Sequence, residues 1–220
     1  ITFMLGSHGC PDHIFPNWFA TFQDKSMQIF SMKALNRRAE KIPSMIKNLE
    51  TKYKLVDDLT PYEEKGIFLE STSSMVFDRV NMIAYIGKSV RTNENLAREW
   101  CSKNGFEIVI FETTSHRNNP IYHTDVLMFV GTEMIGLCDE VINDDYKEEV
   151  LSRAQKYHDV MLLTKDQILD FCGNALEARN NKDEKYLIMS SRAQKSLTSS
   201  QMVKIEKYYA KIVINYYQDR

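Results

Sequence analysis

The stretch SMVFDRVNMIAYIGKSVRTNENLAREWCSKNGFEIVIF, residues 74–111, decides the fold class of this chain. It opens with two runs, 74–80 and 82–88, that are rich in aromatic and β-branched residues and meet at Asn81. Runs of this composition separated by one polar residue are typical of a tight β-hairpin. The first half of the stretch therefore predicts two paired strands.

A helix and a third strand follow this hairpin. Thr92 and Asn93 are residue types that cap helix starts, and Gly105 is typical of a helix end. Residues 106–111 predict a strand. The apolar stripe of the helix consists of Leu96, Ala97, Trp100 and Cys101. The complete unit is strand, strand, helix, strand.

The same order recurs along the chain, although the residues differ. Pro43 interrupts the helix of the earliest copy, which makes that copy the weakest. The earliest copy is predicted at 18–22, 28–32, 37–53 (helix) and 55–56. The copy after Asp125 is predicted at 126–130, 134–138, 144–157 (helix) and 160–163. The last copy is predicted at 175–178, 186–189, 199–209 (helix) and 212–216.

Each predicted unit has one apolar face, which it must bury against its neighbours. A period of roughly 50 residues, with hairpins between the helices, favours a ring of α/β blades over a solenoid. A doubly wound sheet is the structural alternative, but it would place single strands between the helices. Four units and a leading stub, residues 1–4, predict a five-bladed α/β propeller with one incomplete blade.

Polar residues capable of chemistry stand just before or at the first strand of each unit. They are Asp12, Glu70, His123 with Asp125, and Asn174. A ring brings equivalent positions to one axis, so these side chains are expected to face a central cavity. Each also has a structural interpretation: a solvated strand end, a core histidine or a turn residue. Asp125 precedes an apolar run, where a carboxylate is costly without a partner.

Composition limits the function classes. The chain has 220 residues, 43% of them hydrophobic and 26% charged, and a formal net charge of −2. This excludes the basic footprint of nucleic-acid or anionic-membrane binding. No apolar run is long enough to span a membrane, and no signal peptide is recognisable. Four scattered cysteines favour reduced thiols and a cytoplasmic location. Because the chain begins at Ile1, we expect a fragment of a longer protein.

Five strings, in order, resemble one family. They are Pro11-Asp-His-Ile-Phe-Pro-Asn-Trp18, Asn36-Arg-Arg38, Phe68-Leu-Glu-Ser-Thr-Ser-Ser-Met-Val-Phe-Asp-Arg79, Tyr122-His-Thr-Asp125 and Phe171-Cys-Gly-Asn-Ala-Leu-Glu177. Together they are similar to the amidinotransferase/arginine deiminase superfamily, and most closely to its citrulline-utilisation hydrolase branch. The resemblance implies the pentein fold, a five-bladed α/β propeller of ββαβ units. It also implies reaction at the central carbon of a guanidino or ureido group.

The resemblance further implies roles for residues of this chain. In the family, a cysteine thiolate attacks the central carbon and forms a covalent intermediate. His123 would protonate the leaving amine and then activate water. Asp125 would hold His123 or add a contact to the substrate, and Asp12 and Glu70 would bind the planar nitrogen fork of the substrate. The implied catalytic set is His123, Asp125 and Glu70, and the implied substrate-binding set is Asp12, Asn174 and Arg37. No cofactor or metal is implied.

The chain departs from the family at three points. The family nucleophile lies in a Gly-rich C-terminal segment, and the four cysteines here do not match it. We therefore expect residues 1–220 to be one pentein-type catalytic domain, truncated or disordered beyond Arg220, with the nucleophile there. Ser71 and Ser73, in the string Leu69-Glu-Ser-Thr-Ser73, stand where the family typically carries glycines. Asp125 stands where the branch often carries Asn, which leaves citrulline and arginine as alternative substrates.

Several alternatives stay open. The chain could be an amidinotransferase, or a pentein-fold binding protein without catalysis. His8, Cys10 and His13 could be metal ligands, although no fourth ligand has zinc spacing. His158, at a predicted helix end, is interpreted as a solvated cap. The expected partner is a small guanidino or ureido amino acid, with no nucleic acid or membrane, and a homo-oligomer is one alternative for the assembly.

Overall fold

The computed structural model describes residue 6 and residues 9–116 and 119–215. The predicted stub at 1–4, residue 216 of the last predicted strand, and His8 lie outside the described residues. Within the described residues, no helix is both long and apolar enough to cross a membrane.

The unit predicted from residues 74–111 is confirmed. Strand β4 (Met75–Asp78) pairs antiparallel with β5 (Ile83–Gly87), and β6 (Glu107–Phe111) pairs parallel with β5. Helix α4 (Glu94–Asn104) connects β5 to β6. The Asn93 side chain accepts a hydrogen bond from the Leu96 amide at 3.0 Å, and Gly105 ends the helix with φ of +75°. These are the two caps that the sequence indicates.

The other three units have the same pairing: an antiparallel hairpin, then a parallel third strand after a helical connection. Unit one comprises β1 (Phe19–Thr21), β2 (Ser26–Ile29), α1 (Leu35–Arg38), α2 (Pro43–Glu50) and β3 (Lys54–Asp58). Unit three comprises β9 (Met128–Val130), β10 (Met134–Leu137), α5 (Asp144–Tyr157) and β11 (Asp159–Leu162). Unit four comprises β12 (Leu176–Arg179), β13 (Lys185–Ser190), α7 (Ser191–Ser196), α8 (Ser199–Glu206) and β14 (Lys211–Asn215).

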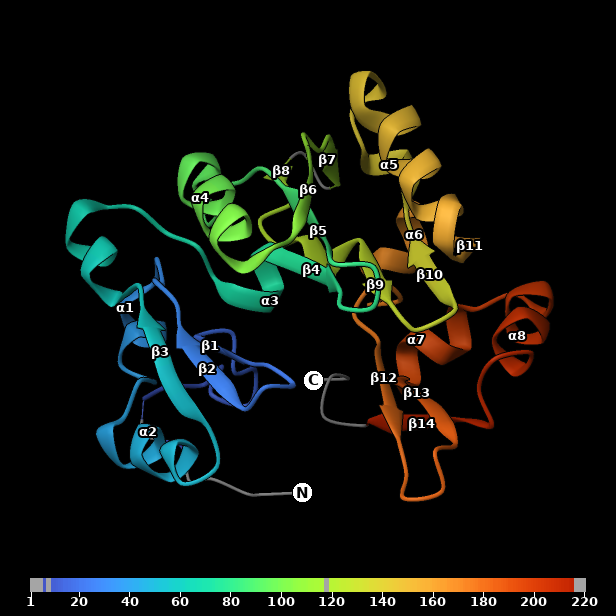
Figure 1. Cartoon of the computed structure of the whole chain (residues 1–220). Coiled ribbons are helices and arrows are strands. Elements are labelled where there is room, and N and C mark those ends of the chain that lie inside the picture. Colours follow the sequence, from blue (N-terminus) through green and yellow to red (C-terminus); the bar gives the residue numbers. More distant parts are fainter. Residues whose placement is uncertain (1–5, 7–8, 117–118, 216–220) are drawn as a thin grey trace.

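The strands of the four units form four separate three-stranded sheets, which rules out the doubly wound alternative. The sheets follow one another around an arc in Figure 1, from unit one at the lower left to unit four at the lower right. The chain is thus a mixed α/β fold with small sheets. Short elements link the units. They are η1 (Thr60–Lys65), α3 (Ser71–Ser74), β7 (Ser115–His116), β8 (Asn119–Pro120), η2 (Thr124–Val126), η3 (Asp139–Val141) and α6 (Lys165–Leu169).

Neighbouring units share their cores. Trp100 of α4 packs against Phe30, which directly follows β2 in unit one, with ring centroids 5.7 Å apart. The Trp100 indole also donates a hydrogen bond of 2.6 Å to the Gln28 side chain of β2. A larger buried cluster joins units two, three and four and includes Tyr85 and Leu187. Burial of aromatic and aliphatic surface between units, rather than within them, is what an apolar-faced repeat requires.

Four local predictions need correction. Pro43 does not interrupt a helix; it is the first residue of α2, a position where its missing amide hydrogen costs nothing. The strand predicted at 126–130 begins only at Met128, because Thr124–Val126 form the 3₁₀ turn η2. His158 is not a solvated cap, because its side chain is fully buried. Helix α7 was not predicted; Ser190 caps it by accepting a bond from the Ala193 amide.

Candidate active site

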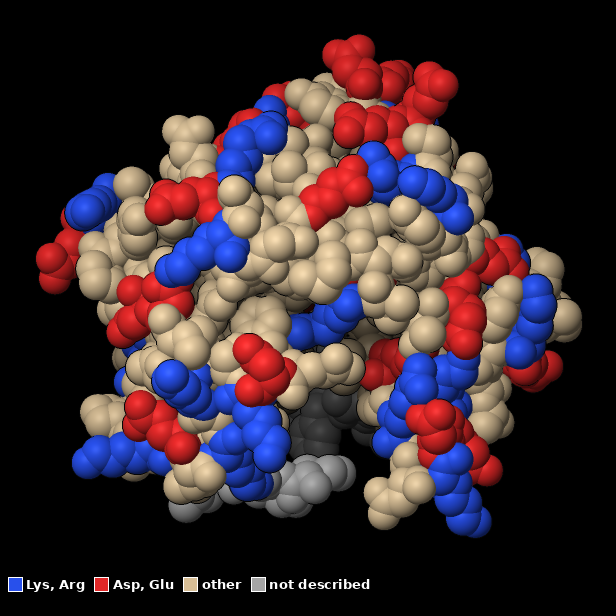
Figure 2. Space-filling view, viewed as in Figure 1, with Lys and Arg blue, Asp and Glu red and all other residues tan. Residues whose placement is uncertain are grey.

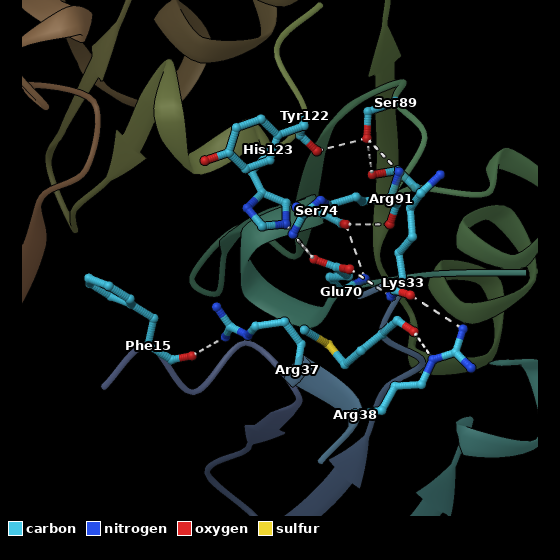
Figure 3. Close-up of polar contacts among 12 residues, drawn as sticks. Phe15, Lys33, Arg37, Arg38, Glu70, Ser74, Ser89, Arg91, Tyr122 and His123 are labelled. Atoms are coloured by element: carbon cyan, nitrogen blue, oxygen red, sulfur yellow. Dashed lines mark hydrogen bonds and ion pairs between the residues drawn. The ribbon is translucent and has the colours of Figure 1, made fainter. Parts of the chain in front are cut away.

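The centre of the candidate site is a hydrogen bond between two units. Glu70, just before α3, and His123, just before η2, approach to 2.6 Å between Oε2 and Nε2 (Figure 3). Both residues are buried, with Glu70 fully inaccessible. The sequence separates them by 53 positions, so only the packing of unit two against unit three brings them together.

Glu70 is held as a carboxylate by further donors. The Lys33 amide donates to its Oε1 at 2.9 Å, and Arg91 lies 3.2 Å from its Oε2 (Figure 3). Burial alone would raise the pKa of Glu70, but the hydrogen bond and charge of His123, with Lys33 and Arg91, lower it below its usual value. A carboxylate that accepts several bonds is stabilised in its charged form. Glu70 is therefore an ionised acceptor facing His123.

Thr124 positions the segment that carries His123 and Asp125. Its hydroxyl donates to the Ser74 carbonyl at 2.7 Å and accepts from the Gly87 amide at 2.9 Å. The side chain is buried, so these bonds replace solvent completely. Thr124 was not among the predicted site residues, although its position between His123 and Asp125 could have indicated it.

The turn before β4 explains one departure from the resembled family. Ser71 takes a φ of +44°, a left-handed conformation that favours glycine. Its hydroxyl donates to the Phe19 carbonyl of β1 at 3.0 Å, which offsets part of that strain. The serine thus ties the Glu70 turn to unit one.

A cavity of about 600 Å³ is lined by residues of all four units; Glu70 and His123 are not among them, but Thr72 and Asp125, each two positions later, are. Figure 2 shows this face of the molecule hollowed between the units at its lower left and lower right. Asp125 and Asn174 both line the cavity, and the Asn174 side-chain amide donates to the Asp125 carbonyl at 3.4 Å. The walls include Phe15, Val76, Met128 and Leu176. The cavity is therefore largely apolar with a few polar groups, as ligand sites are.

The pKa values of Asp125 and Glu70 are shifted in opposite directions. Burial raises the pKa of Asp125, and the nearby charge of Glu70 raises it further, while His123, Ser73 and Arg37 act in the opposite direction. One carboxyl group near His123 is thus held ionised and the other is easier to protonate. Pairs of acids whose pKa values are pushed apart are a recurrent feature of acid–base sites.

Arg37 and Asp12 lie beside the cavity in unit one. The Arg37 side chain is buried; its Nη2 donates to the Phe15 carbonyl (Figure 3), and its Nε lies 2.9 Å from the Glu40 carboxylate. Asp12 is partly buried and close enough to Glu40 to raise its pKa. Glu40 was not selected from the sequence, because nothing in its local pattern distinguishes it from a solvated helix end.

The four cysteines are buried, and none is paired in a disulfide among the described residues. Burial raises the pKa of Cys101 and Cys138 to about 12 and raises that of Cys172 above its usual value. Cys10 donates from its Sγ to the Asn36 carbonyl at 3.3 Å. High pKa values keep thiols protonated and unreactive. Across residues 9–116 and 119–215, no group of three His, Cys, Asp or Glu could hold a metal ion, and His8 lies outside that part.

The family model described as N,N dimethylarginine dimethylhydrolase, eukaryotic, matches residues 2–216. No curated protein matches the chain. Among solved structures, the N-terminal domain of the cyanobacterial arginine dihydrolase ArgZ, a C264S mutant bound to substrate, has a TM-score of 0.72 at 14% identity. That match covers 95% of this chain and 70% of the other.

Two further structures are similar. The C264A mutant of AgrE in complex with L-arginine has a TM-score of 0.72 at 13% identity, over 95% of this chain and 29% of that one. The dimethylarginine dimethylhydrolase (DDAH) of Pseudomonas aeruginosa, a C249S mutant complexed with citrulline, has a TM-score of 0.63 at 15% identity. That match covers 93% of this chain and 70% of the Pseudomonas aeruginosa chain. At such identities the structures establish a shared fold.

Proposed function

Since the chain belongs to the eukaryotic N,N-dimethylarginine dimethylhydrolase family, we propose that it hydrolyses a C–N bond of a guanidino or ureido amino acid. The candidate substrates are arginine and citrulline, which structural relatives bind, and N,N-dimethylarginine, which the family description names. The observation that carries the proposal is the buried 2.6 Å contact between Glu70 and His123, each two positions before a residue that lines the cavity.

In this proposal His123 is the general acid and base. An imidazole can protonate the amine that leaves the central carbon and then remove a proton from the attacking water. Glu70 accepts the hydrogen bond of the Nε2–H and so fixes the orientation of the ring. Asp125 and Asn174 would contact the substrate at the cavity wall, with Asp12 nearby on the loop of unit one.

The covalent route requires a thiolate. Burial raises the pKa values of three thiols, which disfavours Cys101, Cys138 and Cys172 as nucleophiles. The thiol of Cys10 donates a hydrogen bond to the Asn36 carbonyl. A cysteine other than these four would have to attack the central carbon. Its electron pair forms the C–S bond, the amine leaves with a proton from His123, and water then breaks the C–S bond.

We also propose that the four units are consecutive blades of a five-bladed pentein propeller. Their common ββαβ pairing and their succession around an arc support this arrangement (Figure 1). In such a ring the residues before the first strand of each blade face one axis, which agrees with the contact between Glu70 and His123.

The test is an assay of the natural full-length protein with arginine, citrulline and N,N-dimethylarginine. Release of ammonia or dimethylamine, together with the matching amino-acid product, is expected for one of the three. Absence of turnover of all three, in protein shown to be folded, would overturn the proposal. Replacing each cysteine by alanine in turn identifies the nucleophile, since only its loss should abolish turnover.

A binding protein is the second candidate, favoured by one observation: the cysteines of the described residues are buried and three have raised pKa values. This candidate predicts saturable binding of one of the same three compounds by calorimetry without product formation. The two measurements on one sample therefore separate the candidates.

A further inference from the structure

Glu40 is a buried carboxylate outside the Glu70–His123 pair. It follows α1 and is fully inaccessible, and its Oε1 lies 2.9 Å from Arg37 Nε. Neither carboxylate oxygen accepts a hydrogen bond of good geometry from the described residues. A buried acceptor without such bonds is costly and calls for an explanation.

The α1 segment holds a loop that forms one wall of the cavity. We call residues 10–17 the cavity loop; four of its residues, 14–17, line the cavity. Three contacts tie it to α1 and its flanks. They are Cys10 Sγ to the Asn36 carbonyl at 3.3 Å, His13 Nε2 to the Glu40 carbonyl at 3.0 Å, and Arg37 Nη2 to the Phe15 carbonyl.

Arg37 is the only one of these three tethers that carries a full charge at any ordinary pH, and Glu40 is its ion-pair partner. A guanidinium is planar, so an anion held at Nε sets the direction in which Nη2 donates. Glu40 thereby determines where Arg37 holds the Phe15 carbonyl. Arg37 acts on the cavity through this loop.

We propose that Glu40 is a positioning residue that, through Arg37, holds the cavity loop against the cavity and so controls substrate affinity. The inference rests on the proposed function for its kinetic consequence but not for its structural one. The chemical step at His123, which belongs to units two and three, is not expected to change.

Protonation of Glu40 adds a pH dependence. Burial, together with the charges of Asp12 and Glu70, raises the pKa of Glu40 to about 7 despite Arg37. The groups that face it are Arg37 on α1, Asp12 and His13 on the cavity loop, and Glu70 before α3. Above this pH the carboxylate is charged and holds Arg37; below it the neutral acid releases it.

The first measurement is hydrogen exchange of the cavity-loop amides, which needs no activity. The Phe15 amide donates to the Asp12 carbonyl at 2.9 Å, so its exchange reports loop order. After correction for intrinsic exchange, protection in the wild type should be about tenfold greater at pH 8 than at pH 6. In Glu40→Gln it should be low at both pH values. Equal wild-type protection at pH 6 and pH 8 would overturn the inference, even if the variant fails to fold.

The second measurement is kinetic, in the full-length protein. Glu40→Gln should raise KM about tenfold at pH 8 with kcat unchanged, and the ratio of the two KM values should approach one at pH 6. Glu63→Gln is the matched control: Glu63 is a buried, ion-paired carboxylate of unit one whose partners are Lys41, Arg38 and the Met32 amide, none in the cavity loop. A KM effect shared by both variants, or a fall in kcat alone, contradicts the inference. No turnover by the wild type with intact pH-dependent protection would instead refute only the proposed function.

Discussion

Two buried histidine–carboxylate pairs join unit two to unit three, and they differ in the distance between the two side chains and in their hydrogen bonds. His123 and Glu70 are 2.6 Å apart and hydrogen-bonded, and their chain neighbours Asp125 and Thr72 line the cavity, as does Asp78 of the second pair. His158 and Asp78 are 3.5 Å apart, and within the described residues neither ring nitrogen of His158 makes a hydrogen bond. A buried histidine near a carboxylate thus occurs twice between the same two units, and only one of the two pairs is hydrogen-bonded.

The difference lies in what else the carboxylate binds. Asp78 accepts bonds from the Val80 amide, the Asn81 amide and the Asn81 side chain, so its oxygens are committed to the β4–β5 turn. Glu70 accepts the Lys33 amide and Arg91 but directs Oε2 to His123. A carboxylate whose oxygens are bound within a turn is structural, whereas one hydrogen-bonded to a histidine can hold that ring for acid–base chemistry.

The largest effect is expected at His123. His123→Asn removes the proton donor and acceptor, so kcat should fall by about 10²–10⁴-fold. Circular dichroism and the thermal midpoint establish that the variant is folded. A variant that keeps the wild-type rate would remove His123 from the mechanism and make the two pairs equivalent.

Glu70→Gln should have the next largest effect. Loss of the charged acceptor should lower the free energy of unfolding at pH 7 by about 1.5–3 kcal/mol. Since the pKa of Glu70 is lowered in the folded protein, its stabilisation is present above the unfolded value of 4.5 and is lost as pH falls through the folded value. Urea titrations between pH 7 and pH 3 should show that this part of the acid destabilisation is absent in the variant. An acid profile identical to that of the wild type contradicts the assignment.

Asn81→Ala tests the other carboxylate. It deletes the 2.8 Å bond from the Asn81 side chain to Asp78 and should cost about 1 kcal/mol of unfolding free energy. Turnover should fall far less than in His123→Asn, because Asn81 is not among the residues that line the cavity, although Asp78 is. Denaturant unfolding measures the first effect and the substrate assay the second; a large loss of rate would indicate that the Asp78 pair belongs to the site.

His158→Leu should have the smallest effect. Its ring nitrogens lack hydrogen bonds, and replacing an unsatisfied buried polar group by an apolar one of similar size is close to neutral. We expect a change of at most about 1 kcal/mol in unfolding free energy and kcat/KM within about twofold of the wild type. A loss of activity comparable to that of His123→Asn would erase the distinction drawn above.

The sequence by itself determined the repeated unit. The hairpin around Asn81, the Asn93 cap and the Gly105 stop are local signals that act within a few residues, and the structure confirms all three. Two local features were not predictable from residue type. A proline fits the first turn of a helix as well as a helix break, and Pro43 is in a first turn. Ser71 has a positive φ that serine does not indicate.

The tertiary structure alone decided which polar groups meet. The sequence predicted that Glu70 and His123, at equivalent positions of neighbouring units, face one axis, but it did not indicate their direct contact, it treated His158 as solvated, and it did not indicate Glu40 or Thr124. Their burial and partners depend on contacts between units, which residue spacing within one unit does not encode. Periodicity and caps report the local backbone, whereas the environment of a charge is set by the packing of distant segments.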